Sequence, residues 1–265
     1  PHLLLGDTIV REDANGDEYT PEGTEAQAIL DAIAADPQLS IVEPDATASQ
    51  ILAYYTNQLD TFRNQVVGTA TEDLCLERIP GQGRSNLPSC AGTTDDRGGD
   101  IANLVAQAFL FLSKNADVSI QNAGGVRTDI AAGSITIGDA YTLLPFANTL
   151  VDLTMTGEEI RQVLNEAVDF AHDLDGSTGA YPYAAGLRWD VDMTRASGER
   201  LFNIEVKSRD ETQWRPLDDT ESLNVVTNSF TAGGRDGYIT FGTVSDDGRA
   251  VDTFLDYAQS FVDYV

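Results

Sequence analysis

Apolar residues recur every three or four positions in several long segments of the chain, which indicates amphipathic helices. These segments are 24–36, 47–68, 99–113, 157–172 and 251–265. Thr156 stands three residues before Glu159, a capping-box pattern that marks the start of the fourth segment. Pro37 follows the first segment and is typical of a helix end.

Shorter apolar or alternating runs between turn residues predict β-strands. They lie at 3–5, 66–71, 117–121, 149–155, 186–192, 201–207, 222–228 and 238–241. Strands outnumber helices in the last third of the chain, which favours an α+β fold over a doubly wound parallel sheet. We therefore expect a mixed sheet with flanking helices.

The order of these elements predicts three parts. Residues 1–45 carry too few elements to be self-sufficient, and the long helix at 46–66 could connect them to a main domain at 67–265. The opening run, PHLLLGDTIV, resembles the middle of a strand, so we expect the sequence to be part of a longer protein. No apolar run approaches the roughly 18 to 20 residues of a membrane span.

The charge of the chain is strongly negative. The net charge is −27, Asp outnumbers Glu about two to one, and lysine occurs only at Lys114 and Lys207. Carboxylates spread over every segment are typical of a salt-adapted surface, because their repulsion is screened over about 3 Å at 1 M salt. The same charge argues against a nucleic-acid partner, which needs a basic face.

The two cysteines, Cys75 and Cys90, bracket a loop rich in Gly, Pro and Arg. A disulfide there would close a loop of about 15 residues and contribute ~3 kcal/mol in the chain-entropy model. It would also indicate an oxidising, extracytoplasmic setting. The alternative is two unrelated buried thiols.

Three loops carry residues suited to ligand binding. The stretch QNAGGVR, ending at Arg127, follows an apolar strand with glycines that admit a ligand and an arginine that suits phosphate or carboxylate. Phe146 follows a turn, and Phe230 precedes Asp236 in a Gly-rich loop. Each taken alone could be ordinary: a tight turn with a surface Arg, a core aromatic, or a hairpin. Together they suggest a nucleotide clamp, in which aromatic faces grip a base.

Four motifs taken in order resemble one family. NAGGVRTDI, LPFANTLVDLTMTGEEI, GAYPYAAGLRWDV and TNSFTAGGRDGY are similar in order and spacing to the C-terminal domain of the secreted 5'-nucleotidases. The resemblance covers the chain from about residue 66 to its end. It implies that 46–66 is the helix leading from a metallophosphatase domain, and that 1–45 is the last piece of that domain.

The resemblance also implies roles for individual residues. Phe146 and Phe230 are similar to the two phenylalanines that sandwich the base, and Asp236 to the carboxylate that accepts hydrogen bonds from the ribose hydroxyls. Asn148 resembles a base-contacting Asn of the bacterial members.

Further matches concern residues that contact the nucleoside and the phosphate. Asn122, Gly124 and Arg127 fall in the family's NxGGxR motif, and Arg97 stands where the family places another ligand-binding Arg. That last match is looser, because Ala102 replaces a usual glycine. The family usually has Gly-Gly-Asp-Gly where this chain has Arg235 before Asp236, which puts the conformation of that loop in question.

No catalytic residue is predicted in this chain. Only His2 and His172 are present, neither lies in a metal-binding motif, and the chain lacks a nucleophile elbow and a P-loop. The acidic pairs at 95–96, 218–219 and 246–247 are more typical of solvated turns than of glycosidase acids or Ca²⁺ ligands. The resemblance places two divalent metal ions, and the hydrolysis, in the N-terminal domain.

The sequence therefore predicts the substrate-recognition domain of a periplasmic or extracellular 5'-nucleotidase. Its expected partners are a nucleotide or nucleoside and its own N-terminal metallophosphatase domain. Two alternatives remain open: part of a pyrophosphatase acting on NAD or UDP-sugars, and a non-catalytic nucleotide-binding or adhesion module. The base preference and the oligomeric state are not predicted.

Overall fold

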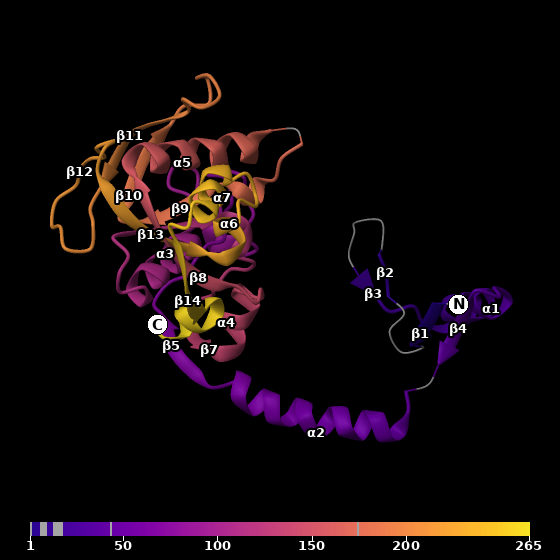
Figure 1. The fold of residues 1–265 in the computed structure, drawn as a ribbon. Coiled ribbons are helices and arrows are strands. Elements are labelled where there is room, and N and C mark those ends of the chain that lie inside the picture. The colour runs from indigo at the N-terminus through magenta and orange to yellow at the C-terminus, as the bar shows by residue number, and fades with distance from the viewer. Residues whose placement is uncertain (1, 6–9, 13–17, 43, 174) are drawn as a thin grey trace. The chain divides into compact units, whose positions relative to one another are not determined.

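The computed structural model describes residues 2–5, 10–12, 18–42, 44–173 and 175–265. It divides into two compact units, one ending at Thr61 and the other spanning Phe62–Val265. Figure 1 shows the order of their helices and strands.

The first unit contains short elements and all but the last two residues of one long helix. Strands β1 (His2–Leu5) and β4 (Leu39–Val42) pair in parallel, and helix α1 (Gly23–Ala35) lies between them in sequence. Strands β2 (Arg11–Glu12) and β3 (Glu18–Tyr19) form a minimal antiparallel pair. Helix α2 (Ala46–Arg63) follows, so the helix predicted for 47–68 ends before Val66, where a strand begins instead.

A five-stranded sheet organises the second unit. Its order is β14 (Ala250–Asp256), β8 (Thr149–Thr156), β13 (Ser222–Asn228), β6 (Val118–Asn122) and β9 (Pro182–Ala185). β13 and β6 run parallel, whereas the other neighbours are antiparallel. The predicted α+β fold with a mixed sheet is confirmed.

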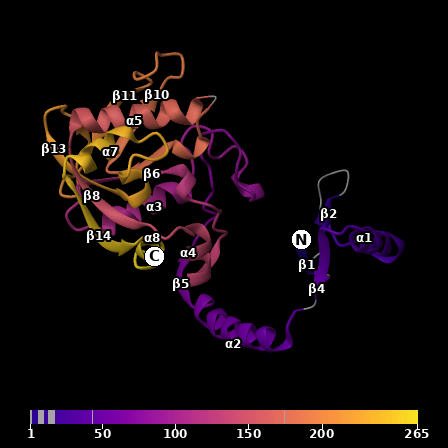
Figure 2. The ribbon, with the colours of Figure 1, turned by 45° about the vertical axis from the view of Figure 1, so that its right-hand side comes forward.

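Helices cover this sheet and fill the core. They are α3 (Asp100–Leu112), α4 (Ile137–Leu143), α5 (Gly157–His172), α6 (Ser229–Ala232), α7 (Ile239–Asp246) and α8 (Tyr257–Val262). Figures 1 and 2 show α5 and α7 side by side along the sheet. The predicted capping box forms at α5: the Thr156 side chain accepts from the Glu159 N–H, and the Glu159 carboxylate accepts from the Thr156 N–H.

Smaller sheets and turns complete the second unit. β10 (Leu187–Val191), β11 (Leu201–Val206) and β12 (Arg215–Pro216) form an antiparallel sheet, and β5 (Val66–Ala70) pairs with β7 (Gly133–Thr136). Three single turns of 3₁₀ helix are η1 (Pro88–Cys90), η2 (Ala123–Gly125) and η3 (Thr178–Ala180). β6 is buried along its whole length, which fixes its carboxyl end firmly.

Two predicted elements are wrong. The run 238–241, predicted as a strand, is the start of α7, because Tyr238, Phe241 and Val244 are all fully buried at a spacing of three, which a helix and not a strand provides. Glu166 accepts a hydrogen bond from the Thr240 N–H in the first turn of that helix.

The final helix, predicted for 251–265, is shorter than expected. Its first half is the edge strand β14, and the helix α8 begins only at Tyr257. Asp256 accepts a hydrogen bond from the Gln259 N–H at 2.8 Å and so caps this later start. The backbone at Phe254 has a φ of +57°, which no helix accommodates.

Candidate ligand-binding cleft

Seven of the eight predicted ligand-binding residues line a single cleft of about 250 Å³ in the second unit. They are Asn122, Gly124, Arg127, Phe146, Asn148, Phe230 and Asp236. They come from three segments: the end of β6 and the turn after it, the loop between α4 and β8, and α6 with the loop that follows it. The fold therefore brings together segments that are far apart in the sequence.

The glycines of QNAGGVR are required by close packing behind the cleft. A Cβ atom on Gly125 would lie 2.2 Å from the Tyr257 hydroxyl and 2.3 Å from the Gln121 amide nitrogen. A Cβ on Gly124 would lie 2.9 Å from the Cα of Gly179. The turn after β6 can therefore lie against η3 only without side chains at these two positions.

A network of amides fixes the carboxylate at the edge of the cleft. The Asn122 Nδ2 donates to the Asp236 Oδ2 at 3.0 Å, and the Asn228 Nδ2 donates to the Asn122 Oδ1 at 3.0 Å and to the Gln121 Oε1 at 2.9 Å. The Gln121 Nε2 in turn donates to the Tyr257 hydroxyl at 2.9 Å. Because these groups are buried and mutually satisfied, Asp236 is held in one position.

Asn228 was missed by the sequence reasoning, although it lines the cleft. Its Oδ1 also accepts from the N–H groups of Phe230 and Thr231, which makes it the N-cap of α6. The signal was present, because Asn directly before a short helix is a preferred cap. Asn228 thus connects the Phe230 backbone to the amide network.

The two phenylalanines line the cleft with much of their surface uncovered. Phe146 is 45% exposed and Phe230 is 42% exposed, although both are large apolar side chains. The Arg127 guanidinium carbon lies 5.8 Å from the centre of the Phe146 ring. Two partly bare aromatic rings in one cleft leave apolar surface that a flat ligand could cover.

The loop around Asp236 accommodates its unusual arginine. Gly234, Asp236 and Gly237 have positive φ values of +77°, +55° and +79°, whereas Arg235 does not belong to the positive-φ residues. An arginine at 235 therefore needs no conformation reserved for glycine. It is exposed and does not line the cleft.

Arg78 is a second cleft arginine, and sequence reasoning missed it. It lies in the loop between Cys75 and Cys90, and its NH1 donates to the Thr178 hydroxyl at 3.3 Å. Burial lowers its pKa, and the charges of Arg84 and Arg127 lower it further, whereas Asp236 opposes them. Two guanidinium groups, those of Arg78 and Arg127, thus line this end of the cleft. No local motif marks Arg78, because its place depends on how the loop folds back.

Arg97 is not brought to this cleft. It lines a separate, larger cleft of about 600 Å³ with Trp189 and His172. Its guanidinium donates to the Thr93 carbonyl at 3.0 Å and pairs with Asp100 at 3.2 Å. The predicted role of Arg97 therefore has no geometric support from its neighbours.

The cysteines form a disulfide, as predicted. The Cys75 and Cys90 sulfurs are bonded, with Cα atoms 5.6 Å apart, and both residues are buried. The bond closes the loop that carries Arg78.

A metal centre does not fit the residues that the structure describes. Among them, no three His, Cys, Asp or Glu side chains gather closely enough to hold a metal ion. His172 directs its Nδ1 to the Val168 carbonyl at 2.9 Å, a contact at the end of α5. Within the same residues, no helix combines the length and the apolarity needed to cross a membrane.

Comparison with known proteins identifies the family of this fold and cleft. Residues 66–243 match the family model described as "5'-nucleotidase, C-terminal domain". The chain therefore belongs to the family of 5'-nucleotidase C-terminal domains.

Individual relatives extend the similarity over nearly the whole chain. The chain is 37% identical to an NAD 5'-nucleotidase of Haemophilus influenzae over all of its own length and 44% of the relative. It is 32% identical to a probable 5'-nucleotidase of Treponema pallidum, covering 99% of the chain and 44% of the relative. The chain thus spans less than half the length of these curated relatives.

Solved structures agree with this assignment. The structure of the H. influenzae NAD nucleotidase aligns with 98% of this chain, using 45% of the nucleotidase chain. The TM-score is 0.68 at 36% sequence identity. The structure of a 5'-nucleotidase precursor from Thermus thermophilus aligns with 96% of this chain, using 45% of the precursor chain. The TM-score is 0.67 at 29% sequence identity.

Proposed function

We propose that the cleft binds the base and ribose of a nucleotide and presents its phosphate for hydrolysis by a metal-dependent N-terminal domain outside this chain. The observation that carries the proposal is that Phe146, Phe230 and Asp236 line one cleft. A base inserted between two aromatic faces gains ~1 to 3 kcal/mol from stacking on each. A carboxylate is a suitable double acceptor for ribose hydroxyls.

The phosphate would lie toward the arginines. Arg127 and Arg78 line the cleft, and the charge of Arg84 acts on Arg78. Arginine suits phosphate because its planar fork donates two hydrogen bonds together. The Nε of Arg78 is buried without a hydrogen-bond partner among the described residues.

A second candidate concerns the substrate class. The relative with 37% identity is named an NAD 5'-nucleotidase, which favours a dinucleotide or a nucleotide-sugar as a substrate of the intact protein. In either case the chain described here supplies recognition, and we expect it alone to hydrolyse nothing. A non-catalytic nucleotide-binding or adhesion module would share the same cleft.

We further propose the division into a terminal piece at 1–45, a connecting helix at 46–66 and a nucleotide-binding domain at 67–265. The buried disulfide supports a periplasmic or extracellular location, where such bonds persist. The net charge of −27 supports adaptation to high salt.

The deciding experiment is a calorimetric titration of the chain with adenosine and with AMP. Saturable binding of adenosine is expected, together with tighter binding of AMP. Absence of adenosine binding would contradict the proposal and favour an adhesion module with an unrelated ligand. An assay of AMP hydrolysis with added Mn²⁺ tests the expected inactivity, which a steady turnover would contradict.

A further inference from the structure

Glu77 is a fully buried carboxylate next to Arg78. Its Oε1 accepts from the Arg78 N–H at 3.0 Å, and its Oε2 accepts from the Gly83 N–H at 2.7 Å and from the Thr94 hydroxyl at 3.0 Å. Burying a carboxylate is costly unless its oxygens are hydrogen-bonded, so these three bonds account for its stability there. They do not yet explain why an acid occupies this position.

The positions of the donors give the reason. Arg78 and Gly83 lie on either side of the turn between them, and both donate their backbone N–H to the same carboxylate. The segment 78–83 is therefore folded into a closed loop around Glu77. Arg78 stands at one end of this loop and Arg84 directly follows the other end.

The backbone of Glu77 is anchored as well. Its carbonyl accepts from the Tyr183 hydroxyl at 3.1 Å, and the same hydroxyl accepts from the Gly99 N–H at 2.9 Å. Tyr183 belongs to β9 of the central sheet and is 4% exposed. Glu77 thus connects the arginine-bearing loop to the rigid part of the domain.

Such a connection is needed because the guanidinium groups repel one another. Arg78 and Arg127 line the same cleft. In the absence of a bound anion, a free loop would move Arg78 away from Arg127. A buried acid whose bonds all go to the loop and its flank keeps them close before the ligand arrives, which lowers the cost of ordering on binding.

We propose that Glu77 is a positioning residue for phosphate recognition, which holds Arg78 at the anion-binding end of the cleft through its hydrogen bonds to the 78–83 loop. This inference rests on the proposed nucleotide-binding function. A nucleoside without a phosphate makes no use of the arginines, so Glu77 affects AMP and leaves adenosine unaffected.

The test compares Glu77→Gln with the unmodified chain by titration with adenosine and with AMP. The amide directs a donor at groups that are themselves donors, so the loop opens. AMP affinity is expected to fall about tenfold or more, whereas adenosine affinity changes less than about twofold. Glu72→Gln is the matched control, because it makes the same chemical change on an exposed residue of the preceding segment, and it should leave both affinities unchanged.

A second pair of variants decides the matter if Glu77→Gln does not fold. Thr94→Val removes one hydrogen bond to Oε2 and should weaken AMP alone, whereas Thr94→Ser keeps the hydroxyl and should restore its affinity. An unchanged AMP affinity in Thr94→Val, or an equal loss for both ligands in either variant, would overturn the inference.

A failure of the proposed nucleotide-binding function would give a different titration result. If the unmodified chain binds no adenosine, the nucleoside site itself is wrong. If it binds adenosine but binds AMP no more tightly, the nucleoside site stands and the positioning role of Glu77 is wrong.

Discussion

The Asn122 side chain donates a hydrogen bond of 3.0 Å to the Oδ2 of Asp236, a residue 114 positions further along the chain. The bond joins the carboxyl end of β6 to the loop after α6. Among the hydrogen bonds of the described residues, none engages the other carboxylate oxygen of Asp236. One oxygen is thus used for positioning, and the other remains free to accept from a ligand.

Asp236→Asn should weaken adenosine binding by about 1.5 to 3 kcal/mol, the usual range for a hydrogen bond to a charged group. An amide presents only one acceptor oxygen, so it cannot keep both the contact to Asn122 and two ribose contacts. Titration with adenosine and 2'-deoxyadenosine measures the effect. The preference for adenosine should shrink in the variant, and an undiminished preference would rule out ribose contact by Asp236.

Phe230→Ala and Phe146→Ala should each weaken adenosine binding by ~1 to 3 kcal/mol, because each removes one stacking face. Phe111→Ala is the matched control. Phe111 has a similar exposure of 47%, compared with 42% for Phe230, but it lies outside the cleft. If the control weakened binding as much as the cleft variants, the loss would not come from stacking.

The local sequence pattern predicted the fold well where the spacing of apolar residues and the helix-capping residues indicated the same element. The helix after Thr156 formed where its capping box and apolar spacing placed it. The local sequence pattern gave the wrong element at 238–241, where β-branched and aromatic residues suggested a strand. The burial of Tyr238 and Phe241 follows a helical spacing instead. That burial depends on contacts with elements distant in sequence, which no local window contains.

The cleft was predictable only in part for the same reason. Phe146, Phe230 and Asp236 were found through loop motifs, and these three residues line one cleft. Arg78, which lies inside the disulfide loop, was missed, whereas Arg97, which follows that loop, was predicted and lines a different cleft. The place of Arg78 follows from the fold of the 78–83 segment, whose Arg78 and Gly83 N–H groups donate to the buried Glu77, and spacing along the chain does not encode that fold.

Gly125→Ala should destabilise the domain by about 1 to 3 kcal/mol, the usual cost of overpacking. The new methyl group would overlap the Tyr257 hydroxyl and the Gln121 amide, both of which belong to the buried network. Urea unfolding measures the change. Gly233→Ala is the control, since a Cβ there meets its nearest atoms at an ordinary 3.5 Å. Equal stability of the two variants would show that the turn after β6 can shift.

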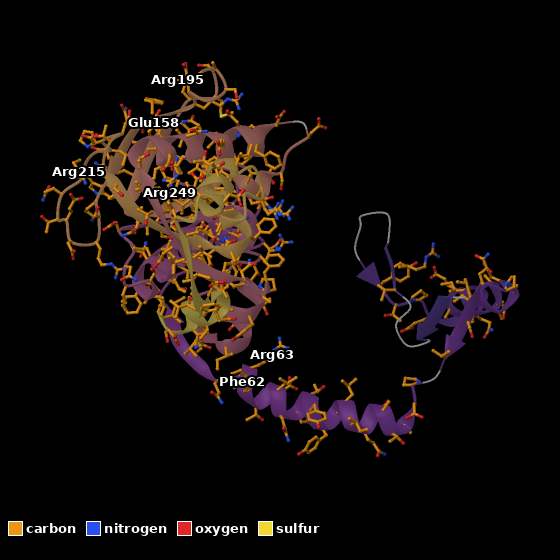
Figure 3. All side chains as sticks on the ribbon, viewed as in Figure 1. Phe62, Arg63, Glu158, Arg195, Arg215 and Arg249 are labelled. Carbon is orange, nitrogen blue, oxygen red and sulfur yellow. A yellow bond between two sulfur atoms is a disulfide. The ribbon has the colours of Figure 1, made fainter. Side chains whose placement is uncertain are left out.

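The pair of Glu159 and Arg249 should make stability depend on pH. Arg249, labelled in Figure 3, bonds the Glu159 carboxylate at 2.7 Å, and this bond is the main reason that the pKa of Glu159 lies below its ordinary value of 4.5. Because the pKa is lower in the folded state, the stabilisation is complete above the unfolded pKa. It is lost as the pH falls through the folded pKa.

Glu159→Gln should therefore reduce the free energy of unfolding at neutral pH, and its difference from the unmodified chain should shrink as the pH falls below the ordinary pKa of 4.5. Glu158→Gln is the control, since Glu158 is the exposed neighbour labelled in Figure 3. Urea unfolding over this pH range provides the measurement. A difference that stays constant with pH would mean that the ion pair contributes nothing and that the variant acts through the cap alone.

High salt should raise the stability of the whole domain. The chain carries 43 acidic residues against 16 Lys and Arg, so repulsion among carboxylates exceeds the attraction within ion pairs. Screening weakens both, but exposed ion pairs contribute only about 0 to 1 kcal/mol each. The midpoint of thermal unfolding should therefore rise between about 0.1 M and 1 M KCl, as the Debye length falls from about 10 to 3 Å. Sucrose at equal osmolality is the control, because it is excluded from the protein surface but does not screen charges. If sucrose stabilises the domain as much as KCl, or if KCl has no effect, charge repulsion does not limit its stability.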